Sequence, residues 1–285
     1  MSTIAGQRKT GNRNVVASRG MAHGLSAGLA VMTVVAAALT FWVPGILTGP
    51  AAMNGSARGT ALVMLMLGVP ALVTAMVHTA RGSLRALVVW AGALGYFVYN
   101  AGMFVFATPY NRLFLGYVAM LSLSVWALVS LLCRARPSSM VTERLPSRSI
   151  AAYMWVTVAL NAFLWLSTIV PSLFAERPAE VTDGTGLATN PVFVQDLAIF
   201  LPAAAVAGLW LWQSRPWGVL LSGAVLTYWV IESVTVGVDQ WFGASADPSS
   251  EVVSMSVVPV FAVLTVVSLV PLWLLLRSIR PLPAG

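Results

Sequence analysis

The stretch GVLLSGAVLTYWVIESVTVGV, residues 218–238, has the length and apolarity of a helix that crosses a membrane, and it holds one charged residue, Glu232. About 20 mostly apolar residues are enough to span the hydrocarbon core of a bilayer. A charged side chain there costs about 2.5–3.5 kcal/mol on insertion scales, and such residues usually face a bundle interior or a wet cavity. The stretch therefore predicts both a membrane protein and a candidate site within it.

The composition of the whole chain extends this prediction. Of its 285 residues, 58% are hydrophobic and 9% are charged, and the mean hydropathy is +0.84. Soluble domains carry about 25% charged residues, so lipid is the expected solvent for most of this chain. Stretches that qualify as spans cover residues 24–47, 60–79, 85–107, 113–133, 150–174, 196–213, 217–240 and 252–276. We expect an all-α integral membrane protein with about eight transmembrane helices.

Cationic residues give the expected orientation, because cytoplasmic loops of membrane proteins are rich in Lys and Arg. With the N-terminus inside, the outer segments hold only Arg58, Arg112 and Arg177. Lys9 is the only lysine, and this bias towards arginine is typical of GC-rich bacterial genomes. We therefore expect a multi-pass protein of the bacterial cytoplasmic (inner) membrane with both termini in the cytoplasm. The arginine distribution accounts for the high isoelectric point, and no nucleic-acid partner is expected.

The chain divides into two membrane parts and three polar segments. Residues 1–23 are polar and basic, and they predict a disordered cytoplasmic tail. Residues 24–133 and 150–277 would each form a four-helix half, with a cytoplasmic connector over residues 134–149 between them. Residues 278–285 complete the chain as a second cytoplasmic tail.

Shifting the sequence by 132 positions superposes Pro70 on Pro202, Tyr96 on Tyr228, and Asn100 on Glu232. Two four-helix halves of the same orientation would be parallel repeats, related by an axis along the membrane normal. The alternative is chance, because apolar sequences align easily and Pro is common in membrane helices. A four-plus-four internal duplication and chance similarity both stay open.

Polar residues in the seventh span lie on one helix face. Tyr228, Glu232, Thr235 and Asp239 follow the spacing i, i+4, i+7 and i+11. The third span carries Tyr96 and Asn100 on one face, with Tyr99 beside them, and the fifth carries Thr157, Asn161 and Thr168. We expect the three polar stripes to turn from lipid towards one another.

Depth along the seventh span places Glu232 in the outer half of the bilayer. It follows Trp217 by 15 residues, or roughly 22 Å from the cytoplasmic side at about 1.5 Å per residue. Asp239 and Asp196 are expected near the outer surface, so the acids predict a cavity that is open to the outside. No Lys or Arg is expected at the depth of Glu232, and burial without a countercharge favours a neutral carboxyl.

These features predict a small-ligand site, for a lipophilic or cationic molecule whose charge could rest on the ring of Trp229. The candidate ligand-binding residues are Tyr96, Tyr99, Asn100, Asn161, Asp196, Tyr228, Trp229, Glu232 and Thr235. No metal or cofactor is expected, since His23, His78 and Cys133 are the only His and Cys residues. A purely structural hydrogen bond that holds helices together remains the alternative for Glu232.

Three functions are compatible with this pattern. The first is binding or transport of a small ligand through an outward-facing polar cavity, with a protonatable Glu232. The second is a membrane-embedded enzyme of the isoprenoid cyclase or isomerase type, in which Glu232 or Asp239 would be the catalytic acid. The third is a scaffold or sensor subunit. Besides the lipid bilayer, neither partner proteins nor an oligomeric state can be assigned from the sequence.

Several further segments support the topology by resemblance. They include residues 59–70, Arg81-Gly82-Ser83-Leu84-Arg85, residues 92–96, residues 110–115, Asn190-Pro191-Val192-Phe193-Val194-Gln195-Asp196-Leu197 and Arg215-Pro216-Trp217-Gly218. Together they resemble a family of actinobacterial-type multi-pass membrane proteins without an assigned activity. The resemblance covers most of the second to seventh spans, and it implies a multi-pass topology but no chemistry.

Overall fold

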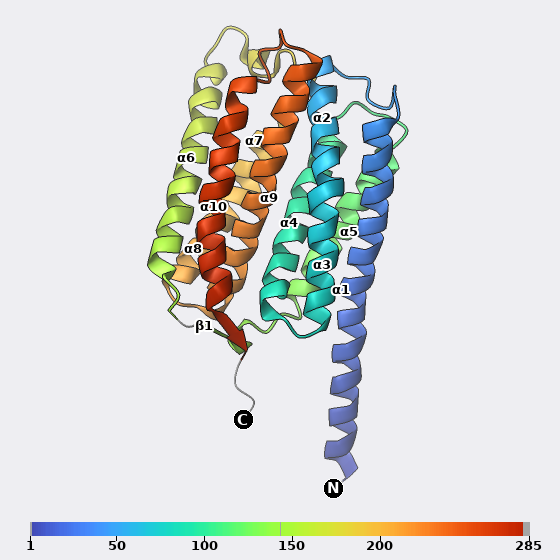
Figure 1. Ribbon diagram of the computed structural model, residues 1–285, viewed down its shortest axis with the longest axis vertical. Coiled ribbons are helices and arrows are strands. Elements are labelled where there is room, and N and C mark those ends of the chain that lie inside the picture. The colour runs from blue at the N-terminus through green and yellow to red at the C-terminus, as the bar shows by residue number, and fades with distance from the viewer. Residues whose placement is uncertain (1, 143, 282–285) are drawn as a thin grey trace.

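A computed structural model describes residues 2–142 and 144–281, and it describes side chains for residues 20–138, 140, 142 and 144–280. Within that part, eight helical spans are long and apolar enough to cross a membrane, which confirms the all-α prediction. The first, third, fourth and fifth are α1 (Ser2–Trp42), α4 (Leu84–Phe106), α5 (Phe114–Leu132) and α6 (Ser147–Leu173), and the seventh and eighth are α9 (Pro216–Ala246) and α10 (Val258–Ser278). The second span joins α2 (Ala51–Val63), η1 (Met64–Gly68) and α3 (Val69–Ala80), and the sixth joins α7 (Pro191–Gln195), η4 (Asp196–Phe200) and α8 (Leu201–Trp212) (Figure 1).

Some predicted boundaries were wrong. The first span ends at Trp42 rather than at residue 47, because Pro44 and Gly45, with a φ of 78°, interrupt the helix. The second begins at Ala51 rather than at residue 60, and the seventh continues to Ala246 rather than ending at residue 240. The predicted disorder of the N-terminal tail was also wrong, because α1 is helical from Ser2 onward and its first turns continue directly into the first span. Residue 1 of that tail, and residues 282–285 of the predicted C-terminal tail, lie outside the described residues.

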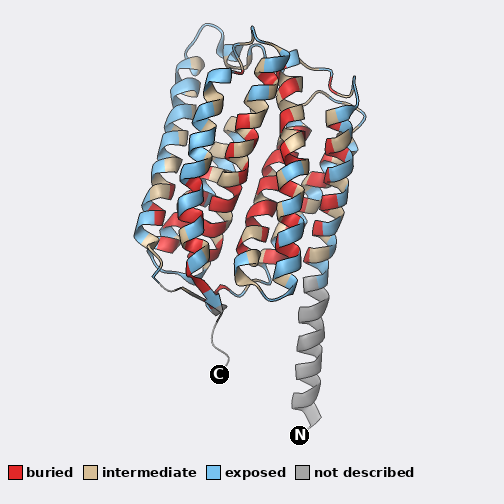
Figure 2. Cartoon of the chain, viewed as in Figure 1, coloured by how far each residue is buried: buried red, intermediate tan, exposed pale blue. Residues whose placement is uncertain are grey.

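The helices α4 and α9 form the centre of the bundle. Most of the residues of α4 are buried, whereas α6 buries only Ile150, Ala151 and Met154. Figure 2 shows the buried residues concentrated on the central helices, and α6 and α1 lie at opposite edges in Figure 1. At Gly92 the central helices touch, since an added Cβ would lie 2.5 Å from the Ala224 carbonyl oxygen.

The helix α2 packs against the far half of α9 through two glycines four residues apart. An added Cβ on Gly59 would lie 2.7 Å from the Asp239 Cα, and one on Gly55 would lie 2.5 Å from the Phe242 carbonyl oxygen. Small residues at this spacing let membrane helices approach backbone to backbone, where van der Waals contact holds them together. The contact joins the first half of the chain to the second.

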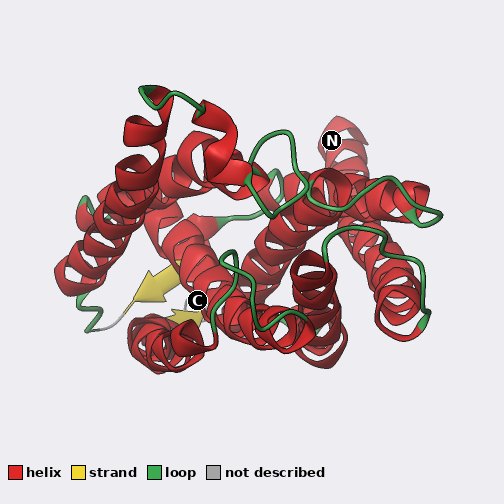
Figure 3. Ribbon diagram, turned by 90° about the horizontal axis from the view of Figure 1, so that it is seen from above, coloured by secondary structure: helices red, strands yellow, loops and turns green. Residues whose placement is uncertain are grey.

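One end of the bundle, which we call the basic end, carries most of the described arginines. Arg81, Arg85, Arg134, Arg136, Arg144, Arg148, Arg215, Arg277 and Arg280 lie in the turns and helix ends there. The predicted connector contains a short strand, β1 (Met140–Thr142), that pairs antiparallel with β2 (Ile279–Pro281) after α10. The strand pair lies across the end of the bundle (Figure 3). Arg85 supports it from α4 by donating from Nε to the Ile279 carbonyl oxygen at 3.2 Å.

The two halves share backbone features that sequence alone does not reveal. Met64–Gly68 and Asp196–Phe200 are both π-helical turns, each followed by a proline at the second position of the next helix. A proline lacks an N–H and its ring clashes with the carbonyl four residues earlier, so a widened turn before it relieves the contact. The two turns lie at the same 132-residue separation as Asn100 and Glu232.

The helix ends that follow these turns also correspond. After α3, Ser83 N donates to His78 O at 3.0 Å and Gly82 N donates to Thr79 O at 2.9 Å. After α8, Arg215 N donates to Trp210 O at 2.9 Å and Ser214 N donates to Leu211 O at 3.0 Å. Both ends are closed by a residue with positive φ, Gly82 at 91° and Ser214 at 55°, as in the Schellman motif.

Candidate functional site

Asn100 and Glu232 meet between the central helices. The Asn100 Nδ2 donates to Glu232 Oε2 at 2.6 Å and to the Tyr96 carbonyl oxygen at 3.2 Å, so the amide group is fixed by its own helix and by α9. Asn100 is 2% exposed, whereas Glu232 is half-buried. The predicted closeness of these two positions is therefore present in the structure.

Only some of the polar side chains in the stripe on α9 contact α4. The Thr235 and Tyr96 hydroxyl groups lie 3.1 Å apart, and the Tyr228 ring lies 5.6 Å from the Tyr99 ring between centroids. These pairs join the two central helices on either side of Glu232. Asp239 instead packs on Gly59 of α2, and its Oδ1 is buried without a hydrogen-bond partner.

Asp196 extends the polar cluster from the sixth span. As the first residue of η4 it is half-buried inside the span, and not at the outer surface where we expected it. Its Oδ2 accepts a hydrogen bond from Trp165 Nε1 at 2.8 Å, and its carboxylate also pairs with the Tyr99 hydroxyl. Asp196 therefore connects α6, η4 and α4.

Three aromatic rings pack against one another beside Asp196, and one of them, Tyr228, lies one turn before Glu232 on α9. Phe200 of η4 is 4.9 Å from the Tyr99 ring and 5.1 Å from the Tyr228 ring, measured between centroids. Next to Asp196, Gln195 lies over Gly102 of α4, where an added Cβ would be 2.5 Å from Gln195 Oε1. The Gln195 Nε2 is buried without a hydrogen-bond partner. We call Asn100, Tyr99, Asp196, Phe200, Tyr228 and Glu232 the polar joint.

Sequence reasoning missed Phe200, Gln195 and Trp165. Phe200 is the shifted counterpart of Gly68, so a comparison of the halves at every position would have singled it out. Gln195 directly precedes Asp196, and Trp165 lies one turn beyond Asn161 on a helix that already carried a polar pattern. Both fall at positions where polar or aromatic groups would also suit a membrane interface.

The stripe on α6 does not join the polar joint. Thr157, Asn161 and Thr168 each donate to a carbonyl oxygen four residues earlier on their own helix, at 3.0, 2.9 and 3.3 Å. Such local bonds satisfy a polar side chain without a partner helix. Trp229 also lies apart from Asn100, because its ring contacts Tyr153 of α6 with 6.3 Å between centroids.

The described cations lie away from Glu232. Arg58, expected in an outer loop, lies inside α2, and its neighbour Gly59 places it level with Asp239, two turns from Glu232. Asp239 is itself two turns inside the end of α9, rather than near the surface as we expected, because that helix continues to Ala246. Ion pairs among the described side chains join Arg177 to Glu180 and Asp183 in the loop after α6.

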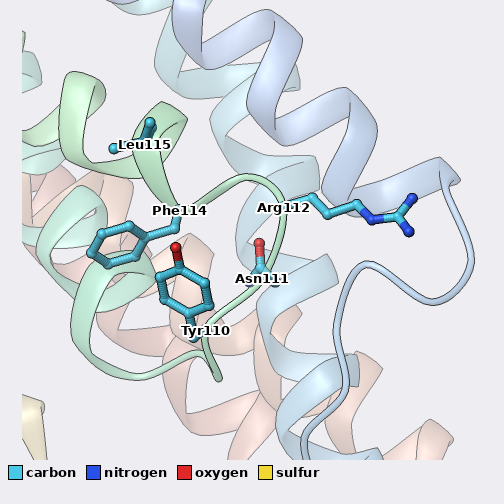
Figure 4. A pocket seen from close by; sticks show the side chains of 5 residues that line it. All are labelled: Tyr110, Asn111, Arg112, Phe114 and Leu115. Atoms are coloured by element: carbon cyan, nitrogen blue, oxygen red, sulfur yellow. The ribbon is translucent and has the colours of Figure 1, made fainter.

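Two surface hollows lie outside the polar joint. One of about 400 Å³ is lined by Tyr110, Asn111, Arg112, Phe114 and Leu115 in the turn between α4 and α5. There the Tyr110 and Phe114 rings lie together, with 5.0 Å between centroids, while Arg112 points away from them (Figure 4). The other, of about 330 Å³, is lined by His23, Val73, Met76, Val77, Ala80 and Arg81 near the basic end.

The polar joint offers acid, amide, hydroxyl and aromatic groups. Glu232 and Asp196 can accept hydrogen bonds or a positive charge, and the rings can face a cation or an apolar group. Within the described part of the chain, no three His, Cys, Asp or Glu side chains are grouped to hold a metal ion. Comparison with protein-family models, curated proteins and solved structures finds no match, so function is inferred from this joint.

Proposed function

We propose that this multi-pass membrane protein binds a small ligand at the polar joint, or carries it across the membrane, with Glu232 as the protonatable group. The observation that best supports this proposal is the 2.6 Å hydrogen bond between Asn100 and Glu232 at the centre of the bundle. The Glu232 carboxyl is half-buried and forms no ion pair with a described side chain. Ionisable groups inside membrane proteins usually serve ligand, ion or proton pathways.

The proposed orientation places the basic end in the cytoplasm of a bacterial cell. The arginine-rich turns at that end support it, because cytoplasmic loops concentrate cationic residues. The described acids gather in the other half of the bundle, at Glu176, Glu180, Asp183, Asp196, Glu232, Asp239, Asp247 and Glu251. In this orientation the ligand reaches the polar joint from the outer face, which has a negative field that attracts cations.

A structural role for the Asn100–Glu232 bond is the competing explanation. Interhelical hydrogen bonds in membranes contribute about 0.6 kcal/mol on average, so removing one seldom prevents folding. A structural bond predicts a small loss of stability and no selective loss of ligand binding. The ligand role predicts the reverse, because it requires a carboxyl that can gain and lose a proton.

The test compares Glu232→Gln with Glu251→Gln, which changes an exposed acid in the same half of the bundle. Each variant is reconstituted in proteoliposomes that contain a pH-sensitive dye, and a panel of small organic cations, anions and neutral solutes is screened. We expect at least one solute to be taken up by the wild type with proton movement. Glu232→Gln should lose both signals while inserting and melting like the wild type, and Glu251→Gln should keep both. Wild-type uptake and proton movement in Glu232→Gln would refute the proposal.

A further inference from the structure

Two contacts join the halves of the chain around the central helices. In the first joint, α2 and η1 pack against α9. In the second joint, α7 and η4 pack against α4. A shift of 132 residues converts η1 into η4, and it superposes α4 on the first part of α9. The packing of η1 on α9 and of η4 on α4 is therefore the same contact made once by each half, whereas α2 also packs on the part of α9 beyond the superposed segment.

Among the corresponding positions of η1 and η4, Gly68 and Phe200 differ most in side-chain size. An added Cβ on Gly68 would lie 2.8 Å from Tyr96 Cε1, so that ring rests on the backbone of η1. The counterpart of Tyr96 is Tyr228, and there the Phe200 ring stands between η4 and the tyrosine, with 5.1 Å between centroids. Phe200 also reaches Tyr99 across the second joint. The Phe200 side chain thus separates η4 from Tyr228, whereas in the first half the backbone of η1 touches Tyr96 directly.

The second joint is also shorter than the first. The helix α2 has 13 residues before its π-helical turn, whereas α7 has 5. On α4, Gly95 lies one turn from Tyr99 and is half-buried, and an added Cβ there would meet nothing within 4 Å. An added side chain at Gly95 therefore has room one turn from Tyr99, whereas one at Gly55 or Gly59 of the first joint does not.

Charge separates the joints as well. Met64 is fully buried in the first joint, and its counterpart in the second is Asp196. Asp196 lies beside Tyr99 and Phe200, Glu232 lies one turn from Tyr228 on α9, and Arg58 belongs to α2 of the first joint. Two carboxylates beside aromatic faces form the kind of environment that recognises ammonium groups.

We propose that the chain consists of two fused repeats, and that only the second joint has become a binding site, for an organic cation. The charged nitrogen sits between Asp196 and Glu232 and against the rings of Tyr99, Phe200 and Tyr228. This inference rests on the proposed function, since it names the ligand class of the same site. When Glu232 is protonated, binding breaks its O–H bond and releases the proton to water, so the net charge of the site stays constant.

The test uses benzyltrimethylammonium and its uncharged isostere neopentylbenzene as probes of the full chain in lipid nanodiscs, with binding measured by calorimetry. We expect the cation to bind at least tenfold more tightly than the isostere. Asp196→Asn and Glu232→Gln should each weaken cation binding at least tenfold. Phe200→Leu keeps an apolar side chain but removes the ring, so it should weaken cation binding several-fold and leave the isostere unaffected. Glu251→Gln should change neither by more than twofold.

The outcomes separate this inference from the proposed function. Equal binding of cation and isostere, both weakened in Glu232→Gln, would overturn the cation class and leave a ligand site at Glu232. Unchanged cation binding in Glu232→Gln would overturn both. If the wild type binds neither probe, the cation site is wrong, and the proteoliposome screen decides the proposed function independently. Melting temperatures within a few degrees of the wild type show that each variant is folded.

Discussion

The first joint is closed by backbone against backbone, whereas the second is held apart by side chains. Gly55 and Gly59 allow α2 to lie directly on α9. In the second joint, Phe200, Tyr99 and Asp196 occupy the space between η4 and α4. Membrane helices associate through close packing, so a joint that gives up packing loses stability. Polar and aromatic side chains therefore lie in the second joint where the first has only backbone contact.

The largest expected effect tests whether the first joint is closed. In Gly59→Leu the new side chain must displace the backbone of α9, because the Cβ alone would lie 2.7 Å from the Asp239 Cα. We expect a loss of about 3 kcal/mol in the free energy of unfolding, at the upper end of typical overpacking costs. Reversible unfolding by detergent in bicelles measures it. Gly95→Leu, on α4 one turn from Tyr99, is the control and should cost less than about 1 kcal/mol, because nothing lies within 4 Å of its Cβ. Equal losses would contradict the difference between the joints.

A smaller effect is expected when the spacer of the second half is copied into the first. Gly68→Phe places a ring against Tyr96 and Phe97, both fully buried, with their nearest atoms 2.8 and 3.1 Å from the new Cβ. We expect a loss of about 2 kcal/mol, because rings can move further than backbone. Val73→Phe adds the same ring at an exposed position of α3 and should leave the unfolding free energy unchanged. If Gly68→Phe is as stable as Val73→Phe, the first half can also accept a spacer.

The smallest expected effect tests whether the helix ends after α3 and α8 are equivalent. Gly82 and Ser214 both have positive φ, a conformation that costs a residue with a Cβ about 1–2 kcal/mol. Gly82→Ser should therefore lower the unfolding free energy by about 1 kcal/mol, and Ser214→Gly should raise it by a similar amount. The double exchange should return to the wild-type value, as measured in the same bicelle assay. Changes of the same sign in both single variants would mean that the two helix ends are not equivalent.

The spans and the central pair were accessible from the sequence for simple reasons. Hydropathy fixes the spans, and the shift of the chain on itself brought Asn100 opposite Glu232 before any contact was known. The orientation of Asp239 was not accessible, because only the packing of Gly59 turns that face of α9 towards α2. That Asn161 has no partner on another helix could not be predicted either, because its side chain bonds to the backbone of its own helix. A polar stripe predicts a partner helix only when its side chains do not form such local bonds.

The two π-helical turns bear on the order in which the features of the two halves arose. A π-helical turn closes its hydrogen bond over five residues rather than four, so it corresponds to one residue inserted into an α-helix. Met64–Gly68 and Asp196–Phe200 carry that insertion at matching places. Under the proposed doubling, the insertion was already present in an ancestral four-helix chain. Under the same proposal, Asp196 and Phe200 replaced the counterparts of Met64 and Gly68 after the π-helical turn had formed.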